Sequence, residues 1–242
     1  MIIYGVNPVT EALRAGRVRR VKVGSRSDTR VQLILSLAAE CGVPVDRLDI
    51  NALDDASRGG AHQGVLAELK PNDDYAVGDL VKNASGPTLL VVLDGVEDPH
   101  NVGAILRSVD AAGADGLIRQ TRRAAALDAA AGKSSAGALA HVPIANVVNI
   151  ARALEELKER DVWTVGLAHD AEQSYDAVDL TLPTAIVLGS EGTGLRRLVK
   201  DRCDVLARIP MAGHVASLNV SVAAGVVLFE AVRQRRACAG RR

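Results

Sequence analysis

A glycine-rich turn with a carboxylate in its middle is the first stretch of this sequence that could support chemistry. The apolar run 185–188 leads into Gly-Ser-Glu-Gly-Thr-Gly at 189–194, and a basic segment begins at Leu195. The turn lacks the Gly-Lys-[Ser/Thr] of a phosphate loop, and Glu191 would repel a polyphosphate. The turn therefore suits a neutral or cationic ligand. A tight turn in which Glu191 begins a helix and is favoured by the helix dipole explains the pattern equally well.

A second glycine turn comes before a long apolar segment that starts with polar residues. The apolar piece 205–210 runs into Met-Ala-Gly at 211–213, and Ser217, Asn219 and Ser221 follow at the mouth of the long segment. Ligands of open α/β sheets bind at the carboxyl ends of strands, where such loops lie. The two loops together predict a small-molecule pocket, although Ser217 and Asn219 are also typical of helix caps.

A third polar cluster follows the apolar strand expected at 89–93. Apolar residues at helical spacing begin at Val102, directly after Asn101, which we expect to be the N-cap of that helix. Arg107 falls in the second turn, on the face away from Ile105. For these two residues a cap and a solvated surface arginine are the plain alternatives to a catalytic role.

The order of expected strands and helices predicts two α/β units. In residues 1–70 the pattern indicates strands at 18–24, 43–50 and 64–69, with helices that begin near residues 7 and 31. Residues 71–87 are rich in Asp, Asn, Gly and Pro, so we expect a linker there. Residues 88–242 alternate strand and helix, which predicts a mostly parallel sheet covered on both faces.

The composition allows a buried core in a protein of the reducing cytoplasm. Of the 242 residues, 48% are hydrophobic but only 2% are aromatic, and the formal net charge is zero. Cys41, Cys203 and Cys238 lack metal-ligand spacing, so we expect free thiols and no bound metal. We expect neither a secretory signal nor a membrane span, because polar residues interrupt the longest apolar stretch, 215–232.

Three segments together resemble the motifs of the SpoU (TrmH) class of RNA ribose methyltransferases, in the same order and spacing. They are NVGAILR at 101–107, IVLGSEGTGL at 186–195 and IPMAGHVASLNVSVAAGVVLFE at 209–230. IYGVNPVTEAL near the N-terminus and HQGVLAEL at 62–69 are similar to the small RNA-binding domain of the RlmB-type subgroup. That subgroup methylates a guanosine ribose in the peptidyl-transferase region of large-subunit (23S) ribosomal RNA.

The resemblance implies a fold that the residue pattern alone does not predict. It implies a SPOUT-type methyltransferase domain at 88–242 with a C-terminal trefoil knot, in which the segment around 209–221 threads back to form the cofactor site. General experience with protein folds argues against knots. The resemblance also implies an N-terminal RNA substrate-binding domain at 1–70 and a homodimer that packs through the knotted region.

The implied reaction transfers a methyl group from S-adenosylmethionine to a ribose 2′-hydroxyl. By resemblance, the cofactor-binding positions are Leu188, Gly189, Ile209 and Leu218, and the catalytic positions are Asn101, Arg107, Glu191, Ser217 and Asn219. A guanidinium is almost never deprotonated, so our hypothesis is that Arg107 grips the adjacent phosphate and orients the hydroxyl. Glu191 would either stabilise a nearby cation or pair with Arg107, and the sequence does not choose between them.

RNA is the expected partner, bound mainly through its phosphates because aromatic side chains are so few. The candidate cations are Arg14, Arg17, Arg19, Arg20, Lys22, Arg119, Arg122, Arg123 and the arginine-rich end at 233–242. His62 is expected to be a loop or RNA contact. Within the class, a tRNA ribose methyltransferase or a ribosomal RNA resistance enzyme is the alternative. The alternative from another class is a catalytically silent RNA-binding protein.

Overall fold

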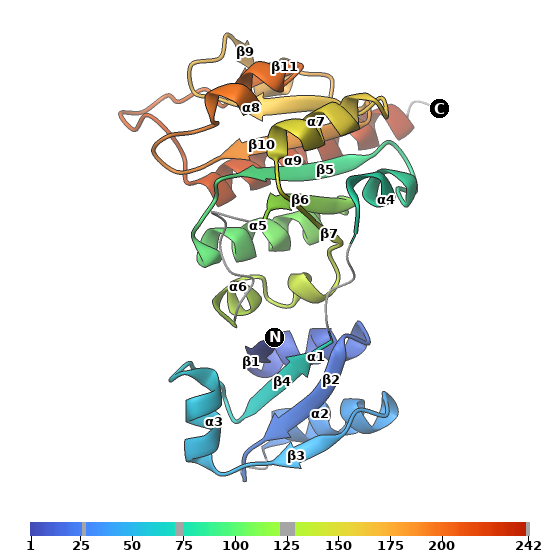
Figure 1. Cartoon of the computed structure of the whole chain (residues 1–242), viewed down its shortest axis with the longest axis vertical. Coiled ribbons are helices and arrows are strands. Elements are labelled where there is room, and N and C mark those ends of the chain that lie inside the picture. The colour runs from blue at the N-terminus through green and yellow to red at the C-terminus, as the bar shows by residue number, and fades with distance from the viewer. Residues whose placement is uncertain (26–27, 71–74, 122–128, 241–242) are drawn as a thin grey trace. The chain divides into compact units, whose positions relative to one another are not determined.

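The structure, a computed structural model, describes residues 1–25, 28–70, 75–121 and 129–240. These residues form two compact units, each built around a sheet of its own (Figure 1). Within the described residues, the first unit holds 1–70 and 129–141, and the second holds 75–121 and 142–240.

The first unit is a four-stranded sheet flanked by helices. The strand order is β1-β4-β2-β3, with β4 antiparallel to both β1 and β2, and with β2 parallel to β3. The strands are β1 (Ile2–Tyr4), β2 (Val18–Val23), β3 (Val45–Arg47) and β4 (Val65–Leu69). The helices are α1 (Val6–Arg14), α2 (Thr29–Glu40), α3 (Ile50–Ser57) and α6 (Ala129–Ser134). The alternation of strands and helices predicted for residues 1–70 is confirmed.

Aliphatic side chains form the hydrophobic core of the first unit. Val21 and Val23 of β2 are buried together with Leu13 of α1 and Ile34 of α2, while Lys22 lies on the other face of the strand. This alternation is the two-residue period of a half-buried strand.

The segment that contains α6 packs in the first unit although it lies far along the chain. A Cβ atom at Gly132 would stand 2.9 Å from Cγ2 of Ile3 in β1, and one at Gly137 would stand 2.5 Å from Cβ of Glu11. Ser135 is buried, and its hydroxyl donates to the Gly132 carbonyl at 2.9 Å. Small residues therefore let this segment approach the N-terminal sheet closely.

The strand predicted at 43–50 is longer than the strand in the structure. β3 covers only Val45–Arg47, and residues 50–57 form α3. The cause is local, because Asp49 accepts a hydrogen bond from the backbone N–H of Ala52 at 2.8 Å and so caps the new helix.

The second unit is a seven-stranded sheet in the order β7-β6-β5-β10-β8-β11-β9, and every strand pair in it is parallel. The strands are β5 (Leu89–Asp94), β6 (Gly116–Gln120), β7 (Ile144–Val147), β8 (Trp163–Leu167), β9 (Gln173–Ser174), β10 (Thr184–Gly189) and β11 (Val205–Arg208). The helices are α4 (Val77–Lys82), α5 (Pro99–Ala111), α7 (Ile150–Lys158), α8 (Arg197–Arg202) and α9 (Val220–Ala239).

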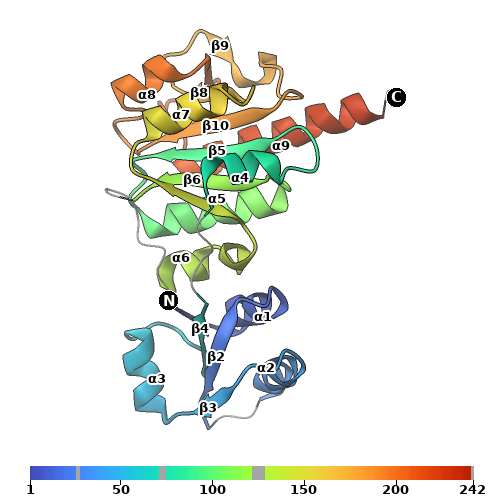
Figure 2. The ribbon, with the colours of Figure 1, turned by 45° about the vertical axis from the view of Figure 1, so that its right-hand side comes forward.

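Helices cover both faces of this sheet (Figure 2). On one face, Leu90 and Val92 of β5 share a core with Leu154 of α7 and Val199 of α8. On the other face α5 and α9 pack against each other, and α9 also contacts β10. The predicted parallel sheet with two covered faces is therefore confirmed. Among the helices that the structure describes, none combines the length and hydropathy that a membrane crossing requires.

Helix α4 lies inside the stretch where we expected a linker. Val77 and Leu80 of this helix are buried in the same core as α7. The backbone N–H of Ala76 donates to Asp79 Oδ2 at 2.9 Å, which closes the first turn. The domain boundaries at residues 70 and 88 stay a prediction.

Arg235 fastens α9 to the starts of the two central strands. Its guanidinium donates to the carbonyl oxygens of Thr88, Leu180 and Leu182 at 3.0 Å each, and also to that of Pro87. Burial lowers the pKa of this guanidinium, but an arginine keeps its charge in proteins. The hydrogen bonds therefore compensate for a charge that has been partly removed from water.

Replacing Arg235 with methionine is expected to lower the free energy of unfolding by about 3 kcal/mol, because the carbonyl oxygens lose charge-assisted partners while the packing of the side-chain stem is kept. Urea unfolding followed by circular dichroism measures this change. Arg236→Met is the matched control at the exposed neighbouring position and should change the stability by less than about 0.5 kcal/mol. Equal unfolding midpoints for the two variants would contradict the anchoring role.

Candidate active site

The two central strands deliver their following loops to one place. β5 and β10 are parallel and in register, so that Asp94 pairs with Gly189 at the carboxyl ends of the two strands. The loop before α5 begins after Asp94, and the glycine turn begins after Gly189. Open α/β sheets bind ligands at the carboxyl ends of their strands. We therefore expect the site at this edge of the sheet.

Gly189 is required by the close approach of its own turn. A Cβ atom at this position would lie 2.1 Å from the carbonyl carbon of Gly194 and 2.3 Å from the nitrogen of Leu195. The turn is closed by two backbone hydrogen bonds between Ser190 and Gly194, at 3.1 and 2.9 Å. Any side chain at position 189 would force the turn open.

The prediction that Asn101 caps α5 is wrong. The helix begins three residues earlier than expected, at Pro99, and its N-cap is Asp98, which accepts a hydrogen bond from the N–H of His100 at 2.9 Å. Proline at the first helical position explains the early start, since its fixed φ suits a helix and it has no N–H that would need a partner. Asn101 therefore lies within the first turn, with its side chain buried and available for another contact.

That contact is a hydrogen-bonded triangle, which we call the Glu191 network and define as Asn101, Glu191 and Asn219. Glu191 Oε1 accepts from the side-chain amide of Asn101 at 2.9 Å and from that of Asn219 at 2.7 Å. The Asn219 amide also donates to Asn101 Oδ1 at 3.0 Å. Hydrogen bonds to an ionised acceptor are about twice as strong as neutral ones. The network thus ties together the first turn of α5, the glycine turn and the start of α9.

Asn219 has two roles through the two ends of its amide. Its Oδ1 accepts from the backbone N–H and the hydroxyl of Ser221, at 2.9 and 2.6 Å, and so caps α9. Its Nδ2 donates to the Glu191 network. The cap and the site contact that the sequence offered as alternatives therefore occur in the same residue.

The sequence analysis missed a second anchor, formed by Asp94, Arg196 and Gln120. Asp94 is fully buried and accepts from the backbone N–H of Arg196 at 2.8 Å and from its Nε at 2.6 Å. Arg196 Nη2 also donates to Gln120 Oε1 at 2.9 Å. This anchor holds the far end of the glycine turn against the end of β5. An acidic residue that ends a buried apolar strand was the available signal, whereas nothing distinguished Arg196 from its basic neighbours.

The remaining predicted site residues lie near these loops without joining the network. Arg107 on α5 and Ser217 before α9 are exposed, and neither side chain has a hydrogen bond or ion pair within the described part of the chain. Leu188 is buried at the end of β10, while Ile209 after β11 and Leu218 before α9 are partly buried. The pairing of Glu191 with Arg107, one of the two roles left open, is not the arrangement found.

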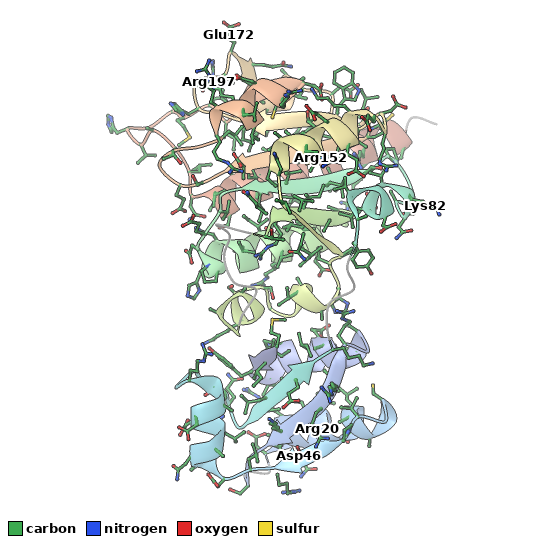
Figure 3. The ribbon with its side chains drawn as sticks, viewed as in Figure 1. Arg20, Asp46, Lys82, Arg152, Glu172 and Arg197 are labelled. Carbon is green, nitrogen blue, oxygen red and sulfur yellow. The ribbon has the colours of Figure 1, made fainter. Side chains whose placement is uncertain are left out.

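Most predicted RNA-binding cations of the first unit already have acidic partners. Arg20 lies beside Asp46 (Figure 3), with Nη1 2.9 Å from a carboxylate oxygen, and Lys22 Nζ lies 2.6 Å from Glu68. Such exposed pairs are weak and can open to a phosphate. Arg119, another of the predicted RNA-binding cations, lies within β6 and is buried. Arg122 and Arg123 lie outside the described residues.

Comparison with known families identifies the class. The model of the SpoU rRNA Methylase family matches residues 88–229, and one described as RNA 2′-O ribose methyltransferase substrate binding matches residues 2–75. The chain belongs to the SpoU rRNA methylase family. The resemblance drawn from the three motifs is thus confirmed.

Individual relatives match over nearly the whole chain. The 23S rRNA (guanosine-2′-O-)-methyltransferases RlmB of Pseudomonas syringae pv. tomato and of Xylella fastidiosa (strain Temecula1) are 47% and 48% identical to it, covering 97% and 96% of this chain and 96% of each relative. The solved SpoU methyltransferase AviRb from Streptomyces viridochromogenes has a TM-score of 0.84 at 28% identity, covering 98% of this chain and 90% of that one. AviRb has also been solved in complex with the cofactor AdoMet, that is, S-adenosylmethionine.

The two roles of Asn219 can be separated by substitution. Asn219→Ser keeps a good N-cap but removes both donations to the Glu191 network, so we expect the free energy of unfolding to fall by only about 1 kcal/mol, from the lost hydrogen bonds alone. The amides of Ser190 and Gly194 should nevertheless exchange with solvent at least several-fold faster, because their turn loses its tie to α9. Hydrogen exchange followed by mass spectrometry measures this.

Two further variants serve as controls for that prediction. Asn219→Ala removes the cap as well and should cost about 1 kcal/mol more. Ser221→Ala removes one donor to the cap and leaves the network intact, so exchange in the turn should not change. Unchanged exchange in Asn219→Ser would show that the turn does not depend on the network.

Proposed function

We propose that this chain is an S-adenosylmethionine-dependent RNA methyltransferase. Its substrate is the ribose 2′-hydroxyl of a guanosine in 23S ribosomal RNA, in the peptidyl-transferase region. The observation that carries the proposal is the Glu191 network, since its three members come one from each of the three family motifs. The nucleotide specificity is supported by relatives of 47% and 48% identity that are named for this reaction.

The loops at the carboxyl strand ends fit the proposed cofactor. The turn at 189–194 has no lysine or arginine, so its chemistry favours an uncharged adenine and a cationic sulfur over a polyphosphate. Gly189 brings the backbone close, and among the described residues none beyond the adjacent ones in the chain lies within 4 Å of the Cβ positions of Gly192 and Gly194. We assign cofactor binding to the backbone around Leu188, Gly189, Ile209 and Leu218. When bound, S-adenosylmethionine supplies an electrophilic methyl group.

The chain's own contribution to catalysis is to orient the ribose. Arg107 is exposed and has no partner within the described residues, so it is available to a phosphate. Its fork geometry allows bidentate contact with the phosphate next to the target ribose. Because a guanidinium does not give up its proton, the hydroxyl proton leaves with the help of that phosphate or of water. Ser217 donates a hydrogen bond to the ribose.

The Glu191 network acts behind these residues. It fixes the first turn of α5 relative to the start of α9. Arg107 lies further along α5, and Ser217 and Leu218 come directly before α9. Correct orientation of reacting groups is worth several kcal/mol of the activation barrier. Asn101, Glu191 and Asn219 therefore position the groups that meet cofactor and ribose.

We assign RNA capture to the first unit, as residues 1–70 of an N-terminal domain joined through 71–87 to the methyltransferase domain at 88–242. The substrate-binding family model at residues 2–75 supports this role. Phosphate contacts by cations such as Arg14, Arg19 and Arg20 would make binding fall with rising salt. The acidic partners of Arg14 and Arg20 would be exchanged for phosphates on binding.

We also propose a trefoil knot at the C-terminus and a homodimer that packs through it. The path from β11 to α9 supports the knot. The chain leaves β11, which pairs with β8, and returns to the first turn of α5, where Asn219 donates a hydrogen bond to Asn101. The dimer is supported by large apolar side chains on this returning segment. Val215, Val222 and Phe229 are 63%, 51% and 51% exposed, and the last two share one face of α9.

The test is methyl transfer from labelled S-adenosylmethionine to separate pools of unmodified ribosomal RNA and tRNA. We expect label as 2′-O-methylguanosine in 23S RNA. Arg107→Lys should retain charge but lose about 10²-fold in turnover, because a point charge cannot hold the phosphate as a fork does. Arg107→Ala should be at least as slow.

Arg152→Ala is the control for these variants, since Arg152 is an exposed arginine on α7 and should leave turnover unchanged. Near-normal turnover in Arg107→Lys would refute the orienting role. Label in tRNA would retain the class and refute the substrate. Absence of both transfer and cofactor binding would leave a catalytically silent RNA-binding protein.

A further inference from the structure

A polar pocket in the first unit has no part in the proposed methyl transfer. It has a volume of about 720 Å³ and lies among the N-terminal ends of α1 and α2, one side of α3 and the loop at residues 60–64. Pockets of roughly 300 to 1,000 Å³ accept small ligands or single nucleotides. All its lining residues belong to one unit.

A buried histidine makes one wall of the pocket rigid. His62 is 7% exposed, its Nδ1 accepts from the backbone N–H of Gly64 at 3.0 Å, and its Nε2 lies 2.9 Å from Asp54 Oδ1. Because Nδ1 is an acceptor, the ring proton is on Nε2 and is donated to Asp54. Oδ2 of Asp54 takes no part in this contact. This carboxylate is 55% exposed at the pocket.

The loop also presents an amide held in an unusual backbone conformation. Gln63 has a φ of 54°, a left-handed value that is uncommon for a residue other than glycine. Its Oε1 accepts from the N–H of Val6, the first residue of α1, at 3.0 Å. Gln63 lines the pocket, and its side-chain Nε2 has no partner within the described residues. Strained residues that the surrounding structure holds in place are typical of functional sites.

The described lining of the pocket carries more acidic than basic side chains, which favours a ligand rich in hydrogen-bond donors. Among the described lining residues, Asp28 and Asp54 are carboxylates and Arg30 is a cation. One Asp28 oxygen already accepts from the N–H of Val31 at 2.9 Å. The carboxylate of Asp54, in contrast, keeps free lone pairs on both oxygens, since its one side-chain contact within the described residues uses a single lone pair of Oδ1.

We propose that this pocket binds an unpaired guanine base of the RNA substrate through its Watson–Crick edge. Guanine carries two adjacent donors, N1–H and the 2-amino group, which match one carboxylate, and O6 beside them accepts from Gln63 Nε2. No other RNA base presents two adjacent donors next to an acceptor. Sequence-specific RNA recognition commonly uses such unstacked bases. The inference rests on the proposed function for RNA as the ligand class, but its test needs no methyl transfer.

The test measures binding of fluorescein-labelled uridine heptamers with one central guanosine, inosine or adenosine, using fluorescence anisotropy and the full chain without cofactor. Wild type should bind the guanosine heptamer about tenfold more tightly than the adenosine heptamer, with inosine between them because it lacks the 2-amino group. Asp54→Asn should abolish this preference. Its Oδ1 still accepts from His62, but a donor replaces the second oxygen.

Asp55→Asn is the matched control, because Asp55 is exposed on the same helix and does not line the pocket. It should keep the wild-type preference. Gln63→Glu is the second variant, since it keeps the acceptor for Val6 and replaces the donor to O6, and it should also lose the preference. Any guanosine binding at the methyl-transfer site is the same in all these variants, since none of them changes that site. It therefore cancels when their guanosine preferences are compared.

Two outcomes would overturn the proposal. One is an equal guanosine preference in Asp54→Asn and Asp55→Asn. The other is an Arg30→Ala variant that weakens all heptamers alike while Asp54→Asn has no effect, which would mean that phosphate alone is bound. Neither outcome bears on the proposed reaction, which is tested by label transfer to 23S RNA. If that transfer fails while the guanosine preference is intact, the proposed reaction is rejected and the proposed guanine pocket stands.

Discussion

The organisation of the candidate active site depends on one carboxylate oxygen. Glu191 Oε1 accepts hydrogen bonds from two asparagines that lie 90 and 28 positions away in the sequence. Each of the three segments that meet here is a loop or a helix end, and such segments are the mobile parts of a fold. Their shared contact fixes them relative to one another at the carboxyl ends of β5 and β10, and the fully buried Asp94 holds the far end of the glycine turn through Arg196.

The Glu191 network raises the question of what the negative charge of Glu191 does in a site that binds a cationic cofactor. Two amide donors satisfy the hydrogen-bonding capacity of one Glu191 oxygen without neutralising its charge. The carboxylate can therefore act as an acceptor that shapes the loops, as a charge that attracts the sulfonium, or as both. The geometry favours the first, because within the described residues the side-chain contacts of Glu191 go to the first turn of α5 and the start of α9.

The sequence predicted the large features because they follow from periodicity and composition. The parallel sheet was visible in runs such as 89–93 and 185–188, and the family in three ordered motifs. Long-range side-chain pairing was not predictable. Asn101 looked like a cap because Asp98 and Pro99 were not recognised as the true start of α5. The link between Asp94 and Arg196 spans 102 positions, and α3 was missed because the capping role of Asp49 was overlooked.

The most direct test of this account compares S-adenosylmethionine with its uncharged product S-adenosylhomocysteine, by calorimetric titration of wild type, Glu191→Gln and Glu191→Ala. Glutamine keeps an oxygen that can accept from both asparagines, whereas alanine removes it. If the network acts by holding the three loops in place, Glu191→Gln will bind both ligands almost normally and Glu191→Ala will bind both at least about tenfold more weakly. If Glu191→Gln instead loses affinity for S-adenosylmethionine alone, the charge and not the network is what the site requires.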